Sequence, residues 1–553
     1  MLKRIQQDEK RQKPNMKTNQ TYLLALLSAF LLWLGWPPIP FTTPLLLIAL
    51  VPLLIAIENI TTSEVTKTGK KIFLISGLTF LVWNTASVYW VYNAIKAYNG
   101  AIVAIPVSLI PFGLGALLMT FAFWLFYRLR KFVNQKIAYL GLISFYITLE
   151  YLQQNWDLAF PWMTLGNGLA GMHQLAQWYD YTGVYGGSFW ILLSNILAFE
   201  AYKTYRSKAG YLRFRMLGIW FAVIIIPVGI SLIKYYNYEE KGTPSNVVVV
   251  QPNIDPYLKL SEIPPATQIN ILTHLSDSVA QTNTEYFIWP ETAIPSYADE
   301  ETIRTNPDYT TLQNFLGKYK NGTLITGIES IKVYPDKRTI SAKYDERSGQ
   351  YFDNFNSAMQ VENSANVQFY HKSKLVPGAE KMPFPKVFSF MDGVFSQLGG
   401  SVSGWGWQEK PNVLYAQSGI GAAPVVCYES LWGDWIGQQV KDGAQFIAII
   451  TNDGWWGNTS GKDQHEMYAK LRAIENRRAV ARSANTGISC FINQRGDITQ
   501  SSKWWTRIAL KSDIHLNDEI TFYTKNGDLT SKLMVVLAII LALVIPFKTW
   551  VKK

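Results

Sequence analysis

Three short segments of this 553-residue chain each carry a reactive side chain directly after an apolar, strand-like run. The reactive residues are Glu291, Lys372 and Cys427. Strand ends are where α/β folds present functional groups, so the placement predicts that the three side chains meet in one site.

The three residue types together can carry out nucleophilic catalysis. A cysteine thiol with a pKa near ~8.5 is mostly protonated at neutral pH, and it becomes an effective nucleophile when a base accepts its proton or a cation stabilises the thiolate. Glu291 can be that base, and Lys372 can stabilise both the thiolate and a developing oxyanion. Taken singly, each residue is ordinary: a surface carboxylate, a solvated lysine and a buried thiol.

The elements that must position these residues lie between residues 246 and 526, where short β-type runs alternate with turns and amphipathic segments. This alternation predicts an α/β core of about 280 residues. The segment 465–484 contains no Gly or Pro and is predicted to be a helix. The predicted strands are 246–250, 285–289, 323–328, 367–370, 421–426, 445–451 and 488–492.

The rest of the chain is apolar enough to lie in a membrane. Hydrophobic residues make up 48% of the sequence and charged residues only 16%. Most of the apolar runs reach the ~17–25 residues needed to cross hydrocarbon, which predicts a polytopic helical bundle of eight spans. The runs are 22–36, 41–57, 72–90, 102–126, 137–152, 184–201, 216–233 and 533–547.

The basic residues between these runs predict an orientation. With the N-terminus inside, the inner loops contain 21 Lys and Arg residues and the short outer loops contain only Lys96. Basic residues are retained on the cytoplasmic side, so the large domain is expected to be extracytoplasmic. The expected division is a membrane domain of seven helices over 1–235, a catalytic domain over 236–531, and a last helix with a cytoplasmic tail over 532–553.

The net charge of +11 sits mostly in those inner loops, so we expect no nucleic acid partner. The two cysteines, Cys427 and Cys490, have neither CxxC nor Cys/His spacing, so we expect no metal site. Nucleophilic catalysis by Glu291, Lys372 and Cys427 needs no organic cofactor, and we expect none. Cys490 lies within an apolar run and is expected to be a buried core residue.

The motifs around the three reactive residues resemble those of the nitrilase superfamily of carbon–nitrogen hydrolases. They are Trp-Pro-Glu-Thr-Ala at 289–293, Lys-x-x-Leu-Val-Pro-x-x-Glu at 372–380 and Cys-Tyr-Glu at 427–429, in that order. Further agreement comes from 451–457, 464–465, 472–475 and 485–487. The resemblance implies a four-layer αββα sandwich.

The layout of the whole chain resembles that of the apolipoprotein N-acyltransferase family. In both, seven N-terminal spans precede this domain and one C-terminal span follows it. That resemblance implies a multi-pass protein of the bacterial inner membrane whose catalytic domain faces the periplasm. It also implies that Glu291 is the general base, Lys372 the stabilising cation and Cys427 the nucleophile. Three further residues match supporting positions of the active site: Glu380, Tyr428 and Glu429.

The reaction implied by the resemblance is a two-step acyl transfer within the lipid bilayer. A phospholipid would donate an acyl chain to Cys427, and the amine of a diacylglyceryl-modified lipoprotein would accept it. Two alternatives remain open: a membrane-tethered amidase that uses water instead of the amine, and a transporter or scaffold whose outer domain only binds. The predicted spans contain almost no ionisable residues, which disfavours transport.

Two departures from the family pattern affect the surroundings of the site. Gly378-Ala379 replaces the more usual Phe-Gly before Glu380, so the backbone between Lys372 and Glu380 is expected to differ locally. Leu260 stands near the position where the family often has a tryptophan. Neither departure removes a reacting group.

Overall fold

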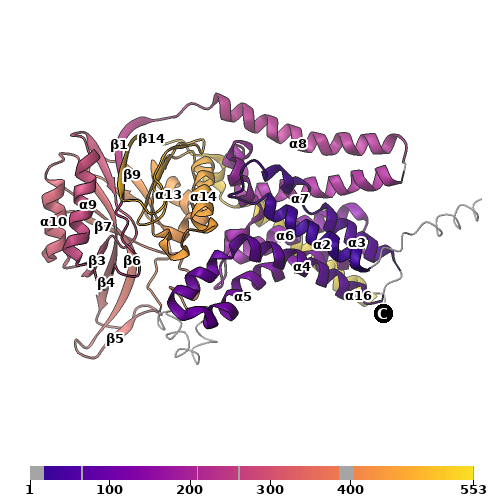
Figure 1. The fold of residues 1–553 in the computed structure, drawn as a ribbon, viewed down its shortest axis with the longest axis horizontal. Helices are drawn as coiled ribbons and strands as arrows, with labels where there is room; N and C mark the ends of the chain where they lie inside the picture. The colour runs from indigo at the N-terminus through magenta and orange to yellow at the C-terminus, as the bar shows by residue number, and fades with distance from the viewer. Residues whose placement is uncertain (1–17, 64–65, 208, 260–261, 385–403, 552–553) are drawn as a thin grey trace, which may run out of the picture.

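The molecule consists of a helical part and an α/β part at opposite ends of an elongated shape (Figure 1). The structure is a computed structural model, and it describes residues 18–63, 66–207, 209–259, 262–384 and 404–551. Leu260 lies outside the described residues.

The helical part contains eight α-helices and three short 3₁₀ segments among the described residues. Each apolar run of the sequence coincides with one helix, except that the second run covers η1 together with α3. The bounds are α2 Thr18–Leu34, η1 Thr43–Leu47, α3 Val51–Thr62, α4 Thr68–Val88, α5 Trp90–Leu129, α6 Gln135–Gln154, η2 Pro161–Met163, η3 Leu165–Ala176, α7 Tyr179–Arg206, α8 Tyr211–Asn237 and α16 Leu529–Val551.

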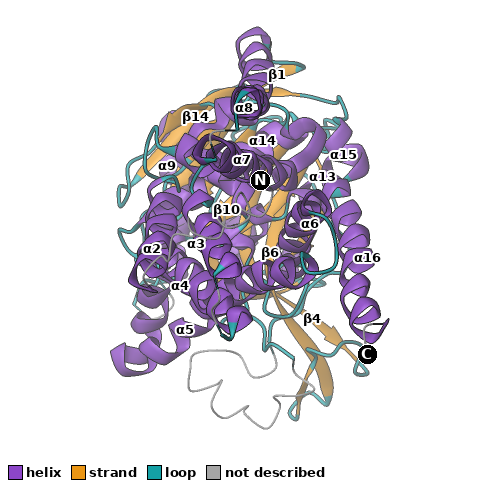
Figure 2. Ribbon diagram, turned by 90° about the vertical axis from the view of Figure 1, so that its right-hand side faces the viewer, coloured by secondary structure: helices purple, strands orange, loops and turns teal. Residues whose placement is uncertain are grey.

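Six helical segments of the described chain are long and apolar enough to cross a membrane: Thr43–Thr62, Thr68–Val88, Gly100–Leu129, Tyr179–Arg206, Tyr211–Asn237 and Leu529–Lys548. Asn19–Leu34 is apolar but shorter. Large apolar side chains on these helices point outward, among them Ile225 and Ile233 on α8 and Leu543 on α16. Continuous apolar faces of this kind indicate contact with lipid. In the view of Figure 2, α16 lies beside α6, against which it packs.

The two parts come into close contact where α7 bends at Gly183. This residue has a positive φ of 61°, and a Cβ atom placed on it would lie 2.3 Å from Cε2 of Tyr523. Tyr523 belongs to α15 (Phe522–Asn526), which precedes α16. The glycine therefore permits both the bend and the approach of the α/β part.

The α/β part is built on two sheets. The first has the strand order β14-β1-β2-β4-β6-β5, with β3 paired to β4 and β7 paired to β6. The second has the order β13-β12-β11-β10-β9-β8. The strands are β1 Thr243–Gln251, β2 Thr284–Ile288, β3 Ile294–Asp299, β4 Thr323–Tyr334, β5 Lys343–Asp345, β6 Gln350–Glu362, β7 Val367–His371, β8 Leu414–Tyr415, β9 Gly421–Val426, β10 Phe446–Thr451, β11 Val480–Ala484, β12 Cys490–Ile492, β13 Ile498–Ser501 and β14 Ile508–Leu516.

The two sheets face one another across a buried apolar layer that includes Val249, Ile325, Val426 and Ile450. The outer face of the first sheet is covered by α9 (Pro265–Val279) and α10 (Pro307–Leu316). The outer face of the second sheet is covered by α13 (Gly433–Lys441) and α14 (Ser460–Asn476). These are the four layers of the expected αββα sandwich.

The prediction of a helix over 465–484 was wrong in its second half. Helix α14 ends at Asn476, Arg477 adopts a left-handed conformation with φ of 48°, and residues 480–484 form β11. Strand β11 pairs in parallel with β10, and this tertiary pairing outweighs local helix propensity. The long strand β6 was not predicted, because its many polar residues do not give the apolar pattern by which the other strands were recognised. It pairs along its length with β4.

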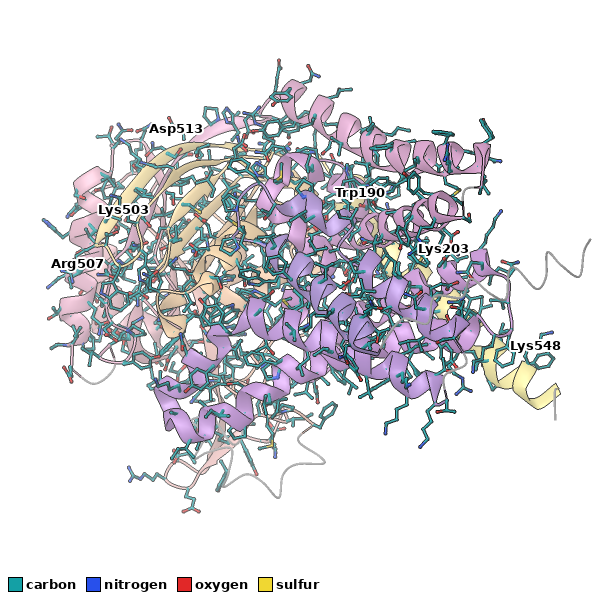
Figure 3. The ribbon with its side chains drawn as sticks, turned by 45° about the vertical axis from the view of Figure 1, so that its right-hand side comes forward. Trp190, Lys203, Lys503, Arg507, Asp513 and Lys548 are labelled. Carbon is teal, nitrogen blue, oxygen red and sulfur yellow. The ribbon has the colours of Figure 1, made fainter. Side chains whose placement is uncertain are left out.

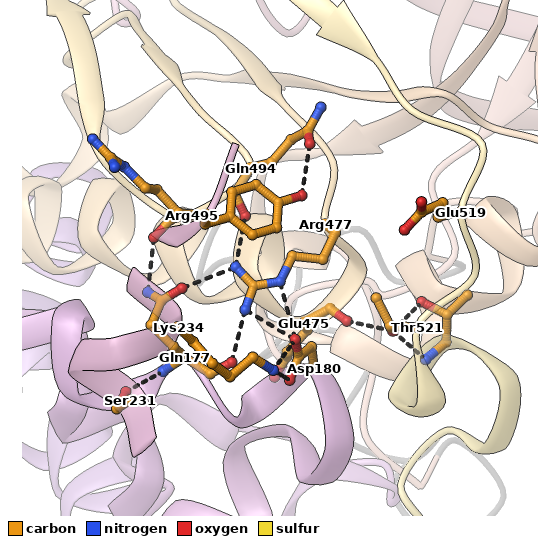
Figure 4. A network of polar contacts seen from close by, with 12 residues as sticks. Gln177, Asp180, Ser231, Lys234, Glu475, Arg477, Gln494, Arg495, Glu519 and Thr521 are labelled. Carbon is orange, nitrogen blue, oxygen red and sulfur yellow. Dashed lines mark hydrogen bonds and ion pairs between the residues drawn. The ribbon is translucent and has the colours of Figure 1, made fainter. Parts of the chain in front are cut away.

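A buried polar network joins the two parts at the end of α14 (Figure 4). The Arg477 guanidinium donates to Asp180 Oδ2 at 2.9 Å and to the backbone oxygen of Gln177 at 2.8 Å. Lys234 of α8 also pairs with Asp180. Buried charges are stable only when paired, so this network fixes how the α/β part sits on the helices.

Candidate active site

Glu291 lies just beyond the end of β2, in a tight backbone turn. The next residue, Thr292, has a positive φ of 48°. The buried Lys259 amine holds this turn, because it donates to Thr292 Oγ1 at 2.9 Å and to the Glu291 backbone oxygen at 3.3 Å. Burial lowers the pKa of Lys259 to about 8, although Glu291 and Glu329 act in the opposite direction.

Lys372 follows β7, and its ammonium group lies between two carboxylates. It is 3.2 Å from Glu291 Oε1 and 2.7 Å from Glu380 Oε1. Asn356 of β6 donates to the same Glu291 oxygen at 2.7 Å. Burial opposes the charge on Lys372, but Glu291 and Glu380 hold its pKa above the usual range. Both hydrogen bonds that the structure describes at the Glu291 carboxylate use Oε1, which leaves Oε2 for proton transfer.

A backbone turn at Gly378-Ala379, where the sequence departs from the family pattern, brings Glu380 back to Lys372. Gly378 has a positive φ of 83° and donates its N–H to the Lys381 oxygen at 2.8 Å. The other carboxylate oxygen of Glu380 accepts from the Val376 N–H at 2.8 Å. The local backbone therefore returns Glu380 to Lys372 with its orientation fixed.

Cys427 lies at the junction between β9 and the 3₁₀ segment η6 (Cys427–Leu431). Its φ of 52° is left-handed, a strained conformation for a residue with a Cβ atom. Burial raises the pKa of the Cys427 thiol and the Glu291 charge raises it further, while Lys372 and a hydrogen bond with Thr451 act to lower it. The thiol is therefore a protonated group within electrostatic reach of Glu291 and Lys372.

Glu429 and Tyr428 have different surroundings. The Glu429 carboxylate is fully buried and accepts hydrogen bonds from Tyr370, from the Ser373 and Lys374 N–H groups and from the Val426 N–H. It thus ties the chain after Lys372 to the strand before Cys427. Tyr428 points toward the helical part and donates to the backbone oxygen of Ala159 at 3.0 Å.

The structure therefore brings together Glu291, Lys372, Glu380 and Cys427. Glu429 links the two chain segments that carry Lys372 and Cys427 by hydrogen bonds. The sequence pattern assigned no role to Asn356 or Lys259, because both lie in segments that contain several other polar residues and carry no recognised motif. It also assigned none to Thr451 and His465, although both lie in segments that matched the superfamily. Among the described residues, no group of three or more His, Cys, Asp or Glu side chains is arranged to hold a metal ion.

A carboxylate with one oxygen unbonded among the described residues, a buried cation and a thiol can together form and break an acyl–sulfur bond. The fold and this arrangement define a carbon–nitrogen hydrolase domain, and residues 247–521 match the family described as carbon-nitrogen hydrolase. Residues 28–197 match the apolipoprotein N-acyltransferase N-terminal domain.

The chain belongs to the apolipoprotein N-acyltransferase family. It is 30% identical over 540 residues to the apolipoprotein N-acyltransferase of Chlorobaculum tepidum, covering 95% of this chain and 96% of that one. It is 27% identical over 515 residues to the protein of the same name from Geobacter metallireducens, covering 92% of each chain.

Solved structures of nitrilase superfamily members are similar to part of this chain. Nit3 of Saccharomyces cerevisiae matches with 14% identity and a TM-score of 0.36, covering 53% of this chain and 97% of that one. An amidase from Nesterenkonia matches with 14% identity and a TM-score of 0.35, covering 53% and 97%.

Proposed function

We propose that this chain completes lipoprotein maturation by transferring a fatty acyl chain from a phospholipid to the N-terminal amine of a diacylglyceryl-modified apolipoprotein. Membership of the family supports the overall reaction. The observation that carries the proposed mechanism is the convergence of Glu291, Lys372 and Cys427 from three separate strand ends.

In the first step Glu291 accepts the proton of the Cys427 thiol, and the thiolate attacks an ester carbonyl of the phospholipid. The carbon–oxygen bond of the ester then breaks. The leaving alkoxide takes the proton from Glu291 and departs as a lysophospholipid, and the acyl chain remains as a thioester on Cys427.

In the second step the lipoprotein amine attacks the thioester carbonyl and gives a proton to Glu291. The carbon–sulfur bond breaks, the amide is released, and the Cys427 thiolate recovers its proton from Glu291. Lys372 stabilises the oxyanion in both steps, and one such donor contributes about 3 kcal/mol to transition-state stabilisation.

Glu380 and Asn356 keep this chemistry aligned. Glu380 fixes the Lys372 ammonium, and Asn356 occupies Glu291 Oε1, so that Oε2 transfers the proton. Tyr428 contributes by contacting the 155–163 loop of the helical part, where lipid substrates would approach.

We propose eight membrane spans in the bacterial inner membrane, with the catalytic domain facing the periplasm and the domain boundaries expected from the sequence. Figure 3 supports this orientation, because Lys203 and Lys548 lie toward the end of the bundle remote from Lys503, Arg507 and Asp513 on the α/β part. An active site near the outer leaflet spares the acyl chains from transfer through water, which costs about 0.8 kcal/mol per methylene.

A membrane-tethered amidase would use the same residues, with water in place of the amine. The test is an assay of the detergent-solubilised full chain with phosphatidylethanolamine and a synthetic diacylglyceryl lipopeptide. We expect N-acylated lipopeptide in the presence of both substrates, and a thioester on Cys427 that neutral hydroxylamine removes when the lipopeptide is omitted. Release of free fatty acid at the rate of acyl-enzyme formation would favour the amidase, and absence of both products would exclude the proposed reaction.

A further inference from the structure

A second buried cluster of polar side chains contacts the backbone oxygen of Cys427. It consists of His465 on α14, Asp453 after β10, Arg482 on β11 and Ser430 on η6. None of these side chains belongs to the proposed catalytic triad. Its four members are at most 1% exposed, so the cluster cannot receive a substrate.

The imidazole of His465 is the centre of the cluster. Its Nε2 atom lies 3.1 Å from the backbone oxygen of Cys427 and 2.8 Å from Ser430 Oγ. Its Nδ1 atom lies 2.9 Å from Asp453 Oδ1 and 3.0 Å from an Arg482 nitrogen. Burial alone would raise the pKa of Asp453, but Arg482 and His465 hold it well below its usual range.

These contacts indicate which nitrogen carries a proton. The Cys427 carbonyl can only accept, so a proton on Nε2 is needed to make that contact a hydrogen bond. When the single Nε2 hydrogen is shared between the Cys427 oxygen and Ser430 Oγ, the two protonation states that carry it satisfy three of the four contacts of the ring. The state with a proton on Nδ1 alone satisfies two, because Nε2 would then face the carbonyl as a second acceptor.

We infer that His465 is a positioning residue for the nucleophile: it donates from Nε2 to the Cys427 carbonyl and so holds the left-handed backbone that aims the thiol at Glu291 and Lys372. Ser, His and Asp here have the connectivity of a hydrolase triad, but burial of Ser430 confines them to orienting the backbone. The inference rests on the proposed role of Cys427.

The ring of His465 also packs against two tryptophans, one of which belongs to the helical part. Trp162, from the 155–163 region, lies 5.7 Å from the His465 ring, and Trp456 lies 5.2 Å from it, centroid to centroid. The neighbouring Gln464 accepts from Trp162 and Trp90 and donates to the backbone oxygens of Pro37 and Ser87. The orientation of Cys427 thus depends on the docking of α14 against the membrane helices.

The test compares His465→Gln, His465→Asn and His465→Leu in the full-length detergent-solubilised enzyme. Glutamine places its N–H₂ near the position of Nε2, whereas asparagine places it near Nδ1. We expect His465→Gln to keep the rate of thioester formation from phosphatidylethanolamine micelles within about tenfold of the wild type. We expect the other two to lose about 100-fold in that rate, since a displacement of about 1 Å at a reacting group has that effect.

A second measurement separates the orientation of the Cys427 thiol from its chemical reactivity. Alkylation of Cys427 by iodoacetamide responds to the charges of Glu291 and Lys372 but does not need the thiol aligned with them, so the Gln and Asn variants should react within about threefold of one another. Equal thioester rates for Gln and Asn, or a faster Asn variant, would overturn the inference. The Gln and Asn pair decides even if His465→Leu fails to fold. A wild type that forms no thioester would instead refute the proposed function.

Discussion

The Lys372 ammonium lies 3.2 Å from Glu291 Oε1, although the two residues are separated by 81 positions and follow different strands. Strands β2 and β7 bring them together because both pair, directly or through β6, with the central strand β4. The ion pair is buried, so each partner fixes the charge and orientation of the other. Cys427 comes to this pair from the second sheet.

Cys427→Ala should abolish acyl transfer, with a loss of at least about 1,000-fold, because its thiol is the group that we propose carries the acyl chain. Cys490→Ala is the matched control, because Cys490 is fully buried in β12 and lies opposite Arg482 in the pairing of β12 with β11. It should retain most of the activity in the lipopeptide assay. Similar losses in two well-folded variants would contradict the assignment of the nucleophile.

Glu291→Gln and Lys372→Met should change the alkylation of Cys427 in opposite directions. The Glu291 charge raises the pKa of the thiol, so its removal lowers that pKa and increases the thiolate fraction at a given pH. Loss of Lys372 acts in the reverse sense. Iodoacetamide rates between pH 7 and 9 should shift about tenfold for each unit of pKa. Slower alkylation of Glu291→Gln would mean that Glu291 assists even this reaction as a base.

Lys259 should give the wild-type enzyme a basic limb near pH 8 in kcat/KM. Its pKa of about 8 means that the amine is charged below that pH and loses its charge above it, which weakens its hold on Glu291 and Thr292. The decline should be about three- to tenfold, as for loss of charge assistance in one hydrogen bond. Lys259→Met should be less active and lack this limb, whereas the surface control Lys318→Met should keep it.

Gln464→Leu should lower the free energy of unfolding by about 2–4 kcal/mol, because two indole N–H groups and two backbone oxygens would lose their buried partner. Gln438→Leu, at an exposed position of α13, should change it by less than about 0.5 kcal/mol. Thermal unfolding in detergent distinguishes them. Equal stability of the two variants would show that Gln464 does not secure the docking of α14.

Labelling of single cysteines in a Cys427→Ala/Cys490→Ala background should report the orientation. A probe at the exposed Asn321 should react with an impermeant maleimide in intact spheroplasts, and a probe at the exposed Ser207 should react only after permeabilisation. We expect this pattern because basic residues are concentrated in the loops that the prediction places in the cytoplasm. A reversed pattern would place the catalytic domain in the cytoplasm and exclude lipoprotein amines as its substrates.

The sequence by itself determined the order of the motifs, the apolar runs and the two kinds of domain. Glu291, Lys372 and Cys427 were recognisable because each follows a strand-like run and keeps a distinctive local motif. Apolar segments of sufficient length are also a local property, and each coincides with a helix or with η1 and α3.

Only the tertiary structure decided which polar residues support the site. Asn356 lies in a strand whose pairing with β4 is not encoded by local alternation, and Lys259 gains its contact through the turn at Thr292. The helix expected over 465–484 is divided because residues 480–484 gain more from parallel pairing with β10 than from helix formation. That division places Arg482 beside Asp453 and His465, a contact between separate elements that no local pattern specifies.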